Sequence, residues 1–97
     1  MTKKLKIEEI KQKLQDITNW NISEDNLFLI CEYKFKNWLE VMDFIKKISK
    51  IAENLNHHPN INFTYGFCKI KTQTHDVGGI TQLDFELATK INGICNT

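Results

Sequence analysis

The sequence predicts an α+β domain, a four-stranded antiparallel sheet with three helices packed on one face, in the order α-β-β-α-β-β-α. Two pairs of segments alternate apolar and polar residues around short turns, which is typical of β-hairpins. Three further segments repeat apolar residues every three or four positions, which is typical of amphipathic helices. Because each of these elements has one apolar face to cover, helices on one side of a single sheet are the expected arrangement.

The first third of the chain is predicted to form a helix and a hairpin. Residues 5–16 should be a short amphipathic helix, because apolar residues recur at helical spacing at Ile7, Ile10, Leu14 and Ile17. Trp20 and Ile22 indicate a short strand, and "SEDN" indicates the turn after it. A second strand follows over 27–35. Its apolar face, which we expect to meet the core, comprises Leu27, Leu29, Cys31, Tyr33 and Phe35.

The longest predicted helix starts at Asn37 and continues for about 18 residues. Pro59 forbids its continuation, because the residue before a proline is pushed out of the α region, so the helix should end near His57. We expect Trp38, at its start, to be a core residue. The apolar positions of this helix are Trp38, Val41, Met42, Ile45, Ile48, Ala52 and Leu55.

A second hairpin is predicted after the long helix. Its first strand alternates apolar residues at Ile61, Phe63 and Tyr65. Gly66 permits a turn, and a second alternating run extends from Cys68 to His75. We expect Tyr65, like most aromatic side chains, to lie in the core.

The last helix is predicted from a capping signal. Residues 76–80, "DVGGI", should form a loop. "TQLD" then resembles a capping box, with Thr81 as the N-cap and Asp84 in the third helical position. The helix should run through Phe85, Leu87, Ala88 and Ile91.

Composition limits the function classes. The 97 residues are enough for one core, so residues 1–97 are predicted to be a single domain. All basic residues are lysines and the net charge is +1, so nucleic acid is not an expected partner. No segment approaches the roughly 20 apolar residues that span a bilayer, so no membrane is expected either. The three cysteines suggest neither a disulfide framework nor a zinc motif, which fits a soluble protein of the reducing cytoplasm.

The three histidines lie at the ends of predicted elements, His57 and His58 at the exit of the long helix and His75 where the last strand ends. Glu53 lies four residues before His57, so the two side chains share a face if the helix persists. This anion and the helix C-terminus both favour a protonated imidazole, which makes His57 a candidate proton donor near neutral pH. His58 precedes Pro59 and should leave the chain in a different direction.

His75 belongs to the polar side of its strand, where we expect Asp76 or Asp84 to neutralise or orient it. Each of these residues also has a purely structural interpretation. A histidine at a helix end is often a capping residue, Asp84 is often only a cap, and Glu53 with His57 could be a solvated pair. The three histidines could also bind zinc, although they lack tight ligand spacing.

Taken together, the spacing of these residues resembles the signature of the pterin-4a-carbinolamine dehydratase family. Intervals of three, five, nine and eight residues separate the matched positions, which are Glu53, His57-His58-Pro59, Tyr65, His75 and Asp84. Trp20-Asn21 before the first hairpin and "FKNW" at the start of the long helix extend the resemblance over nearly the whole chain. The predicted order of elements is also similar to that of the family.

The resemblance implies an enzyme that removes water from 4a-hydroxytetrahydropterin to give quinonoid dihydropterin, in the regeneration of tetrahydrobiopterin. It implies no metal, nucleotide or other cofactor. It also implies that His57 and His75 transfer protons, that Glu53 and Asp84 orient them, and that His58 is mainly a substrate contact.

The same resemblance suggests a location for the substrate and a set of partners. The pterin would lie between the "HHP" turn and the "THDV" strand end, where the further lining residues would be Pro59, Thr74, Asp76 and Val77. Similar proteins assemble as homodimers or homotetramers through sheet edges and the long helix. Animal relatives also act as dimerisation cofactors for a homeodomain transcription factor, so a non-catalytic binding module is the alternative function.

Overall fold

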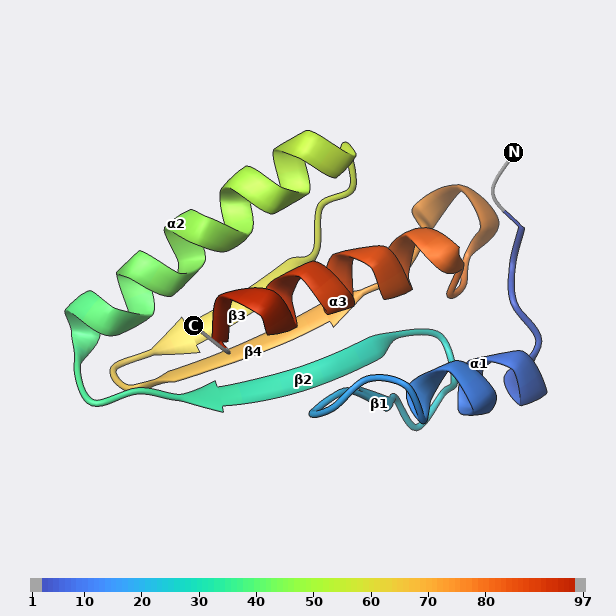
Figure 1. Cartoon of the computed structure of the whole chain (residues 1–97), viewed down its shortest axis with the longest axis horizontal. Helices are drawn as coiled ribbons and strands as arrows, with labels where there is room; N and C mark the ends of the chain where they lie inside the picture. The colour runs from blue at the N-terminus through green and yellow to red at the C-terminus, as the bar shows by residue number, and fades with distance from the viewer. Residues whose placement is uncertain (1–2, 96–97) are drawn as a thin grey trace.

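The computed structural model describes residues 3–95, and its helices and strands follow the predicted order (Figure 1). The elements are α1 (Ile7–Leu14), β1 (Asn21–Ile22), β2 (Leu29–Lys34), α2 (Trp38–Leu55), β3 (Asn60–Thr64), β4 (Phe67–Thr72) and α3 (Gln82–Cys95). A short 3₁₀ helix, η1 (His75–Val77), lies between β4 and α3. The plain loop predicted over 76–80 is therefore wrong for its first two residues.

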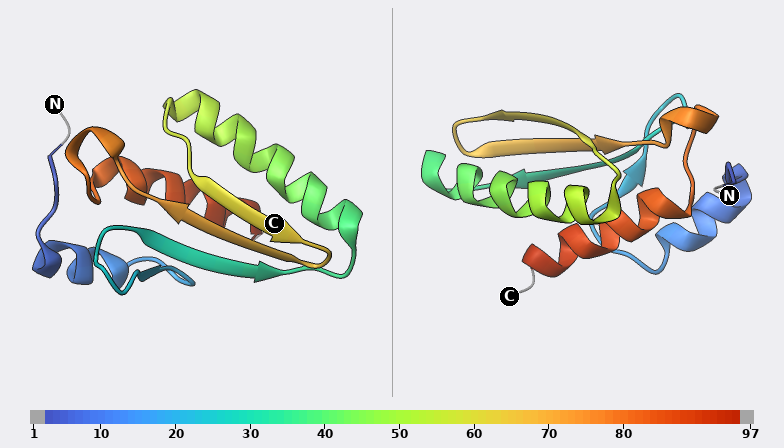
Figure 2. Two further views of the ribbon diagram at one scale, coloured as in Figure 1. Left: turned by 180° about the vertical axis from the view of Figure 1, so that it is seen from behind. Right: turned by 90° about the horizontal axis from the view of Figure 1, so that it is seen from above.

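The sheet is antiparallel throughout, with strand order β1-β2-β4-β3. The two longest strands, β2 and β4, form its centre in a ladder that begins at Leu29↔Thr72. β3 is an edge strand, and its pairing with β4 ends at Asn60↔Lys71. Figure 2 shows α1, α2 and α3 on the same side of this sheet, which confirms the predicted fold class.

The core lies between the helices and the inward face of β2 and β4. Side chains alternate along both strands, so that positions 29 and 31 of β2 and positions 68, 70 and 72 of β4 are buried. The buried residues of α2 are spaced three or four apart. Each fully buried aliphatic side chain of this kind stabilises the fold by about 1.5–3 kcal/mol. The buried residues include Leu29, Cys31, Cys68 and Ile70 of the sheet, Val41 and Ile48 of α2, and Leu87, Ala88 and Ile91 of α3. Within residues 3–95, no helix has the length and apolar character needed to cross a membrane.

The C-terminal end of α2 determines where the adjacent histidines go. Asn56 has a left-handed conformation with φ of 52°. The N–H groups of Asn56 and His57 then donate to the carbonyl oxygens of Glu53 and Ala52, at 3.2 and 3.0 Å. This pattern closes a helix by turning the chain away from its axis. As a result, His57 and His58 leave the helix in two directions.

Two aromatic residues expected in the core lie on the surface instead. Trp38, the first residue of α2, is 44% exposed, and its ring packs against that of Phe63 on the edge strand, with ring centroids 5.8 Å apart. Tyr65 is 69% exposed because it lies in the turn between β3 and β4, outside the alternation that points side chains to the helices. Leu27 also precedes the observed start of β2 and is exposed. All three core predictions were wrong for the same reason. Each residue lies at the end of its element, past the part that the facing helices or strands cover.

Candidate active site

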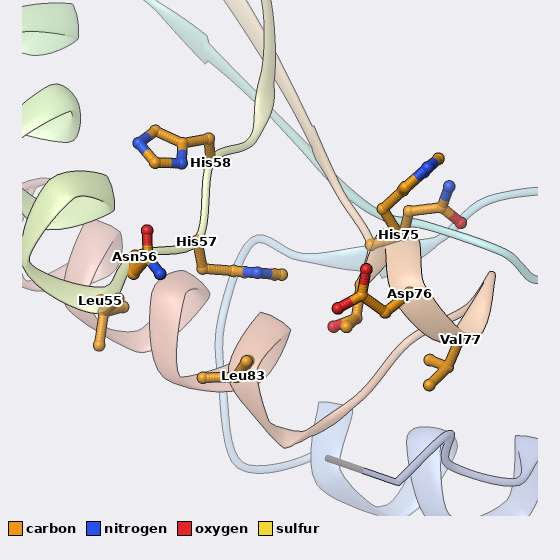
Figure 3. Close-up of a pocket in the computed structure, with 10 residues that line it drawn as sticks. Leu55, Asn56, His57, His58, His75, Asp76, Val77 and Leu83 are labelled. Carbon is orange, nitrogen blue, oxygen red and sulfur yellow. The ribbon is translucent and has the colours of Figure 1, made fainter. Parts of the chain in front are cut away.

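A cavity of about 790 Å³ opens at the end of the sheet where β4 ends and β3 begins. Its walls come from the turn after α2, from the end of β4 with η1, and from the first turn of α3. The lining residues are Leu55, Asn56, His57, His58, Gln73, Thr74, His75, Asp76, Val77 and Leu83. Figure 3 shows His57 and His58 on one side of this space and His75 with Asp76 on the other. The chain thus brings all three of its histidines to one cavity of a size common for small-molecule sites.

His57 is held by a buried carboxylate. Its Nε2 lies 2.6 Å from Oδ1 of Asp84 on α3. The His57 side chain is 10% exposed and that of Asp84 is fully buried. A carboxylate is costly to bury unless hydrogen bonds compensate for its lost hydration, so its other contacts decide whether this arrangement is stable.

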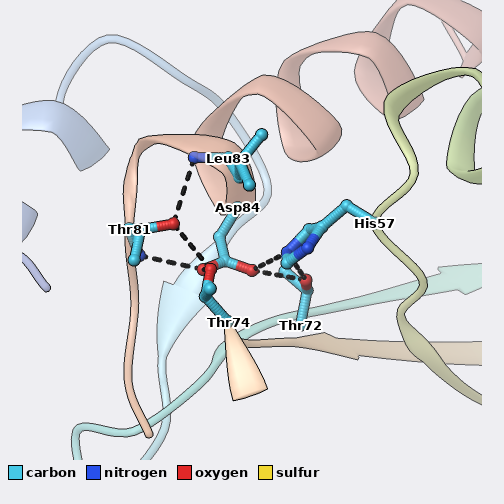
Figure 4. Close-up of polar contacts among 6 residues, drawn as sticks. All are labelled: His57, Thr72, Thr74, Thr81, Leu83 and Asp84. Atoms are coloured by element: carbon cyan, nitrogen blue, oxygen red, sulfur yellow. Dashed lines mark hydrogen bonds and ion pairs between the residues drawn. The ribbon is translucent and has the colours of Figure 1, made fainter. Parts of the chain in front are cut away.

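Those contacts saturate the Asp84 carboxylate (Figure 4). Oδ1 also accepts a hydrogen bond from Thr72 Oγ1 at 2.6 Å. Oδ2 accepts from Thr74 Oγ1 and from the Thr81 backbone N–H, both at 2.9 Å. Because Thr74 uses its one hydroxyl hydrogen on Asp84, the 2.6 Å contact between Thr81 Oγ1 and Thr74 Oγ1 must be donated by Thr81. Hydrogen-bond donors therefore surround both carboxylate oxygens.

This geometry fixes the tautomer of His57. An ionised carboxylate only accepts hydrogen bonds, so the nitrogen that faces Asp84, Nε2, carries a hydrogen. Nδ1 is then the atom of His57 that is available to exchange a proton with a ligand. Figure 3 shows the ring projecting into the space between the two sides of the cavity.

Local sequence explains why Asp84 is there. Half of the predicted capping box is present, because Asp84 Oδ2 accepts from the Thr81 N–H. Thr81 Oγ1 is also a cap, but it accepts at 3.2 Å from the N–H of Leu83, the second helical residue, in place of Asp84, the third. Strand alternation points both Thr72 and Thr74 toward the helices, where they reach the same carboxylate. Asp84 is therefore both a helix cap and the partner of His57, and one role does not exclude the other.

The predicted pairing of Glu53 with His57 is wrong. Glu53 Oε2 instead lies 2.5 Å from Nε2 of His58. The prediction assumed that α2 continues to His57, but the helix ends at Leu55 and the left-handed Asn56 turns the chain. His58 comes back over the last helical turn as a result. Both members of this second pair are exposed, the imidazole by 56% and the carboxylate by 75%.

The predicted orientation of His75 by Asp84 or Asp76 is also wrong. Asp84 is engaged with His57 from the opposite wall. His75 opens η1, is exposed, and makes no side-chain hydrogen bond to any residue of the range 3–95. His75 is therefore an imidazole that a ligand can reach without displacing a protein partner.

The other predicted lining residues fall into two groups. Thr74, Asp76 and Val77 line the cavity. Pro59 does not: it lies beside a smaller hollow of about 340 Å³ on the α2 side, together with Ile61 and other residues. Sequence reasoning missed four lining residues, namely Leu55, Asn56, Gln73 and Leu83. Two of them could have been found from the sequence, because Asn56 directly precedes the "HHP" turn and Gln73 directly precedes "THDV".

The arrangement is suited to proton transfer on a small ligand. It combines one imidazole fixed by a buried carboxylate with two exposed imidazoles around the same cavity. Within residues 3–95, no three His, Cys, Asp or Glu side chains gather closely enough to hold a metal ion. The fold and the cavity together define a small α+β protein with a histidine-lined site.

Comparison with known proteins identifies the family. The family described as "Pterin 4 alpha carbinolamine dehydratase" matches residues 3–94, so the chain belongs to it. A protein of Sulfolobus acidocaldarius named "Putative pterin-4-alpha-carbinolamine dehydratase" is 43% identical over 91 residues, which cover 94% of this chain and 98% of that protein. A protein of the same name from Rickettsia canadensis is 41% identical over 90% of this chain and 80% of its own length.

Solved structures agree with this assignment. The crystal structure of a transcriptional coactivator/pterin dehydratase from Brucella melitensis superposes with a TM-score of 0.91 at 27% identity, over 95% of this chain and 98% of that one. A pterin dehydratase-like protein described as a RuBisCO assembly factor in the alpha-carboxysome has a TM-score of 0.65, with 77% of this chain and 87% of that one covered. At 18% identity, the second likeness shows the fold alone.

Proposed function

We propose that this protein eliminates water from 4a-hydroxytetrahydropterin to give quinonoid dihydropterin, as a step in tetrahydrobiopterin regeneration. The observation that carries the proposal is the cavity in which His57, fixed by Asp84, faces His75 across the space that a substrate would fill. Membership of the pterin-4a-carbinolamine dehydratase family supports the substrate class.

The reaction needs two proton transfers and nothing else. One group protonates the hydroxyl at C4a so that it leaves as water, and another takes the proton from the ring N5–H, whose electron pair then forms the C4a–N5 double bond. The proton given equals the proton taken, so the reaction is balanced without any further reactant. Imidazoles do both tasks near neutral pH. We assign these transfers to His57 and His75, on opposite walls of the cavity.

Asp84 and His58 have supporting roles in this proposal. Asp84 is a positioning residue: it holds the imidazole of His57 in one tautomer, so that Nδ1 is the atom that exchanges the proton. His58, whose Nε2 is engaged with Glu53, lines the cavity and serves as a substrate contact.

The direct test generates 4a-hydroxytetrahydropterin in place with a phenylalanine hydroxylase and follows its ultraviolet decay. Wild-type protein should accelerate the decay. His57→Ala and His75→Ala should each lower the rate about 10²- to 10⁴-fold, and the double variant should approach the uncatalysed rate. No acceleration by folded wild-type protein would leave the non-catalytic binding module as the function.

A second proposal, self-association, rests on exposed apolar side chains. Leu39 and Trp38 on α2 are 77% and 44% exposed, and Phe63 and Tyr65 lie on or next to the edge strand β3. We propose that these residues are covered in a homodimer or homotetramer. Light scattering after size-exclusion chromatography should give a mass of two or four chains for the wild type, and a smaller mass for Leu39→Lys with Phe63→Lys. A monomeric wild type would refute it.

A further inference from the structure

Gln73 carries an unsatisfied polar atom in the wall of the cavity. Among the buried polar side-chain atoms of residues 3–95, Gln73 Oε1 is the one without a hydrogen-bonding partner. Buried amide oxygens are almost always hydrogen-bonded, because an unmade bond costs the full desolvation of the group. The contrast with the saturated carboxylate of Asp84 indicates that Gln73 is not part of the structural hydrogen-bond network.

Strand alternation separates Gln73 from that network. Thr72 and Thr74 turn their hydroxyl groups to Asp84 on the helix side of the sheet. Gln73 stands between them and therefore points to the opposite side. At this position no donor of residues 3–95 reaches the amide oxygen of Gln73, and the residue lines the same cavity as the three histidines.

The end of the β3–β4 ladder leaves room beside Gln73. The last paired residues are Asn60 and Lys71. His58 lies two positions before Asn60 and Gln73 two positions after Lys71, so both lie just beyond the end of the ladder. Pro59 lies between and has no N–H, so it cannot continue the ladder as a donor. The cavity opens where pairing stops, with His58 and Gln73 both in its wall.

We infer that Gln73 is a specificity-determining residue whose amide oxygen accepts a hydrogen bond from an N–H group of the bound pterin, an inference that rests on the proposed function. A carboxamide does not exchange protons near neutral pH, so its role is recognition and not proton transfer. Oε1 is itself buried, so the side chain would have to rotate to present it to a ligand, and because the Gln73 side chain makes no hydrogen bond within residues 3–95, this rotation would break none. Pterins carry ring N–H and amino groups, which are the donors that a neutral acceptor recognises.

Two substitutions at this position separate recognition from packing. Gln73→Met keeps the length of the side chain and removes the acceptor, whereas Gln73→Glu keeps an acceptor oxygen. Gln73→Met should raise KM for 4a-hydroxytetrahydropterin and Kd for 7,8-dihydropterin, measured by calorimetry, about tenfold, with kcat within about twofold of wild type. Gln73→Glu should restore Kd to within about threefold of wild type. The melting temperature of ligand-free Gln73→Met should be no lower than that of the wild type, because an unsatisfied buried atom has been removed.

The controls keep this inference distinct from the proposed function. Gln12→Met makes the same chemical change on the exposed surface of α1 and should leave KM and Kd unchanged. If the wild type neither binds nor converts pterins, the proposed function is wrong and the role of Gln73 falls with it. If the wild type is active and Gln73→Met has wild-type KM and Kd, only the role of Gln73 is overturned. Weakened binding in Gln73→Met that Gln73→Glu does not restore would overturn the acceptor role.

Discussion

His57 and His58 are neighbours in the chain and each contacts one carboxylate, yet the two pairs are held in opposite ways. His57 and Asp84 are 10% and 0% exposed, whereas His58 and Glu53 are 56% and 75% exposed. The buried carboxylate has further donors around it, and the exposed one contacts its imidazole at the edge of solvent. Because water screens and competes with an exposed pair, only the buried pair can hold an imidazole in one orientation.

Removal of Asp84 should have the largest effect. Asp84→Ala leaves His57, Thr72, Thr74 and the Thr81 N–H without an acceptor, so the free energy of unfolding should fall by about 3–5 kcal/mol. Dehydratase activity should fall with it. Urea unfolding followed by circular dichroism measures the free energy of unfolding, and the pterin decay assay measures the dehydratase activity.

The matched variant Asp84→Asn preserves shape and presents an amide NH₂ to groups that are themselves donors. It should therefore fold with lower stability than the wild type and with an imidazole that is no longer held by an anion. An Asp84→Asn protein with wild-type stability and rate would mean that the buried carboxylate positions nothing.

The next largest effect should distinguish the two histidines. His57→Ala removes a nearly buried side chain from a saturated network, so it should lower both activity and stability. His58→Ala removes an exposed one, so stability should change by about 0.5 kcal/mol or less while KM for the pterin rises. Equal losses of stability in the two variants would contradict the view that the burial of a histidine determines its contribution to stability.

Double-mutant cycles should sharpen the comparison further. For Glu53 and His58, changed to Gln and Ala, the coupling free energy should be about 0.5 kcal/mol or less and should vanish in about 1 M salt. The cycle for Asp84 and His57, with Asn and Ala, should give a larger coupling that salt changes little. A larger coupling for the exposed pair would reverse the interpretation.

The smallest effect concerns a buried ionisable group whose pKa shift comes from burial. Burial raises the pKa of the Cys68 thiol from 9.0 to about 11. The contribution of this group to stability is therefore fully present below pH 9 and is lost as the pH rises toward 11. At pH 8 Cys68 should resist iodoacetamide in the folded protein and react in urea, as peptide mass spectrometry would show. Rapid labelling of the folded chain would contradict its burial.

Local patterns predicted much of the fold and part of the site. Three local patterns are present: the periodicity of α2, the alternation of β4 and the Thr81 N–H to Asp84 half of the capping box. Each depends on residues within a few positions of one another. The incorrect predictions involve ends of elements. Trp38 and Tyr65 fit the pattern of their elements but lie beyond the covering layer, which no local pattern encodes.

The partners of the histidines required the tertiary structure for a specific reason. Helical spacing predicted that Glu53 would pair with His57. Because Asn56 has a left-handed conformation and turns the chain, Glu53 contacts His58 instead. Asp84 lies 27 positions from His57, and only the packing of α3 against the end of the sheet brings them within 2.6 Å.

The sequence by itself determined the α+β class, the order of elements and the residue types available for proton transfer, because these follow from short-range periodicity and composition. The tertiary structure alone decided which carboxylate holds which imidazole, which side chain remains unpaired in the cavity wall, and which apolar residues stay exposed. Those choices depend on where distant elements meet and how much water their contact excludes.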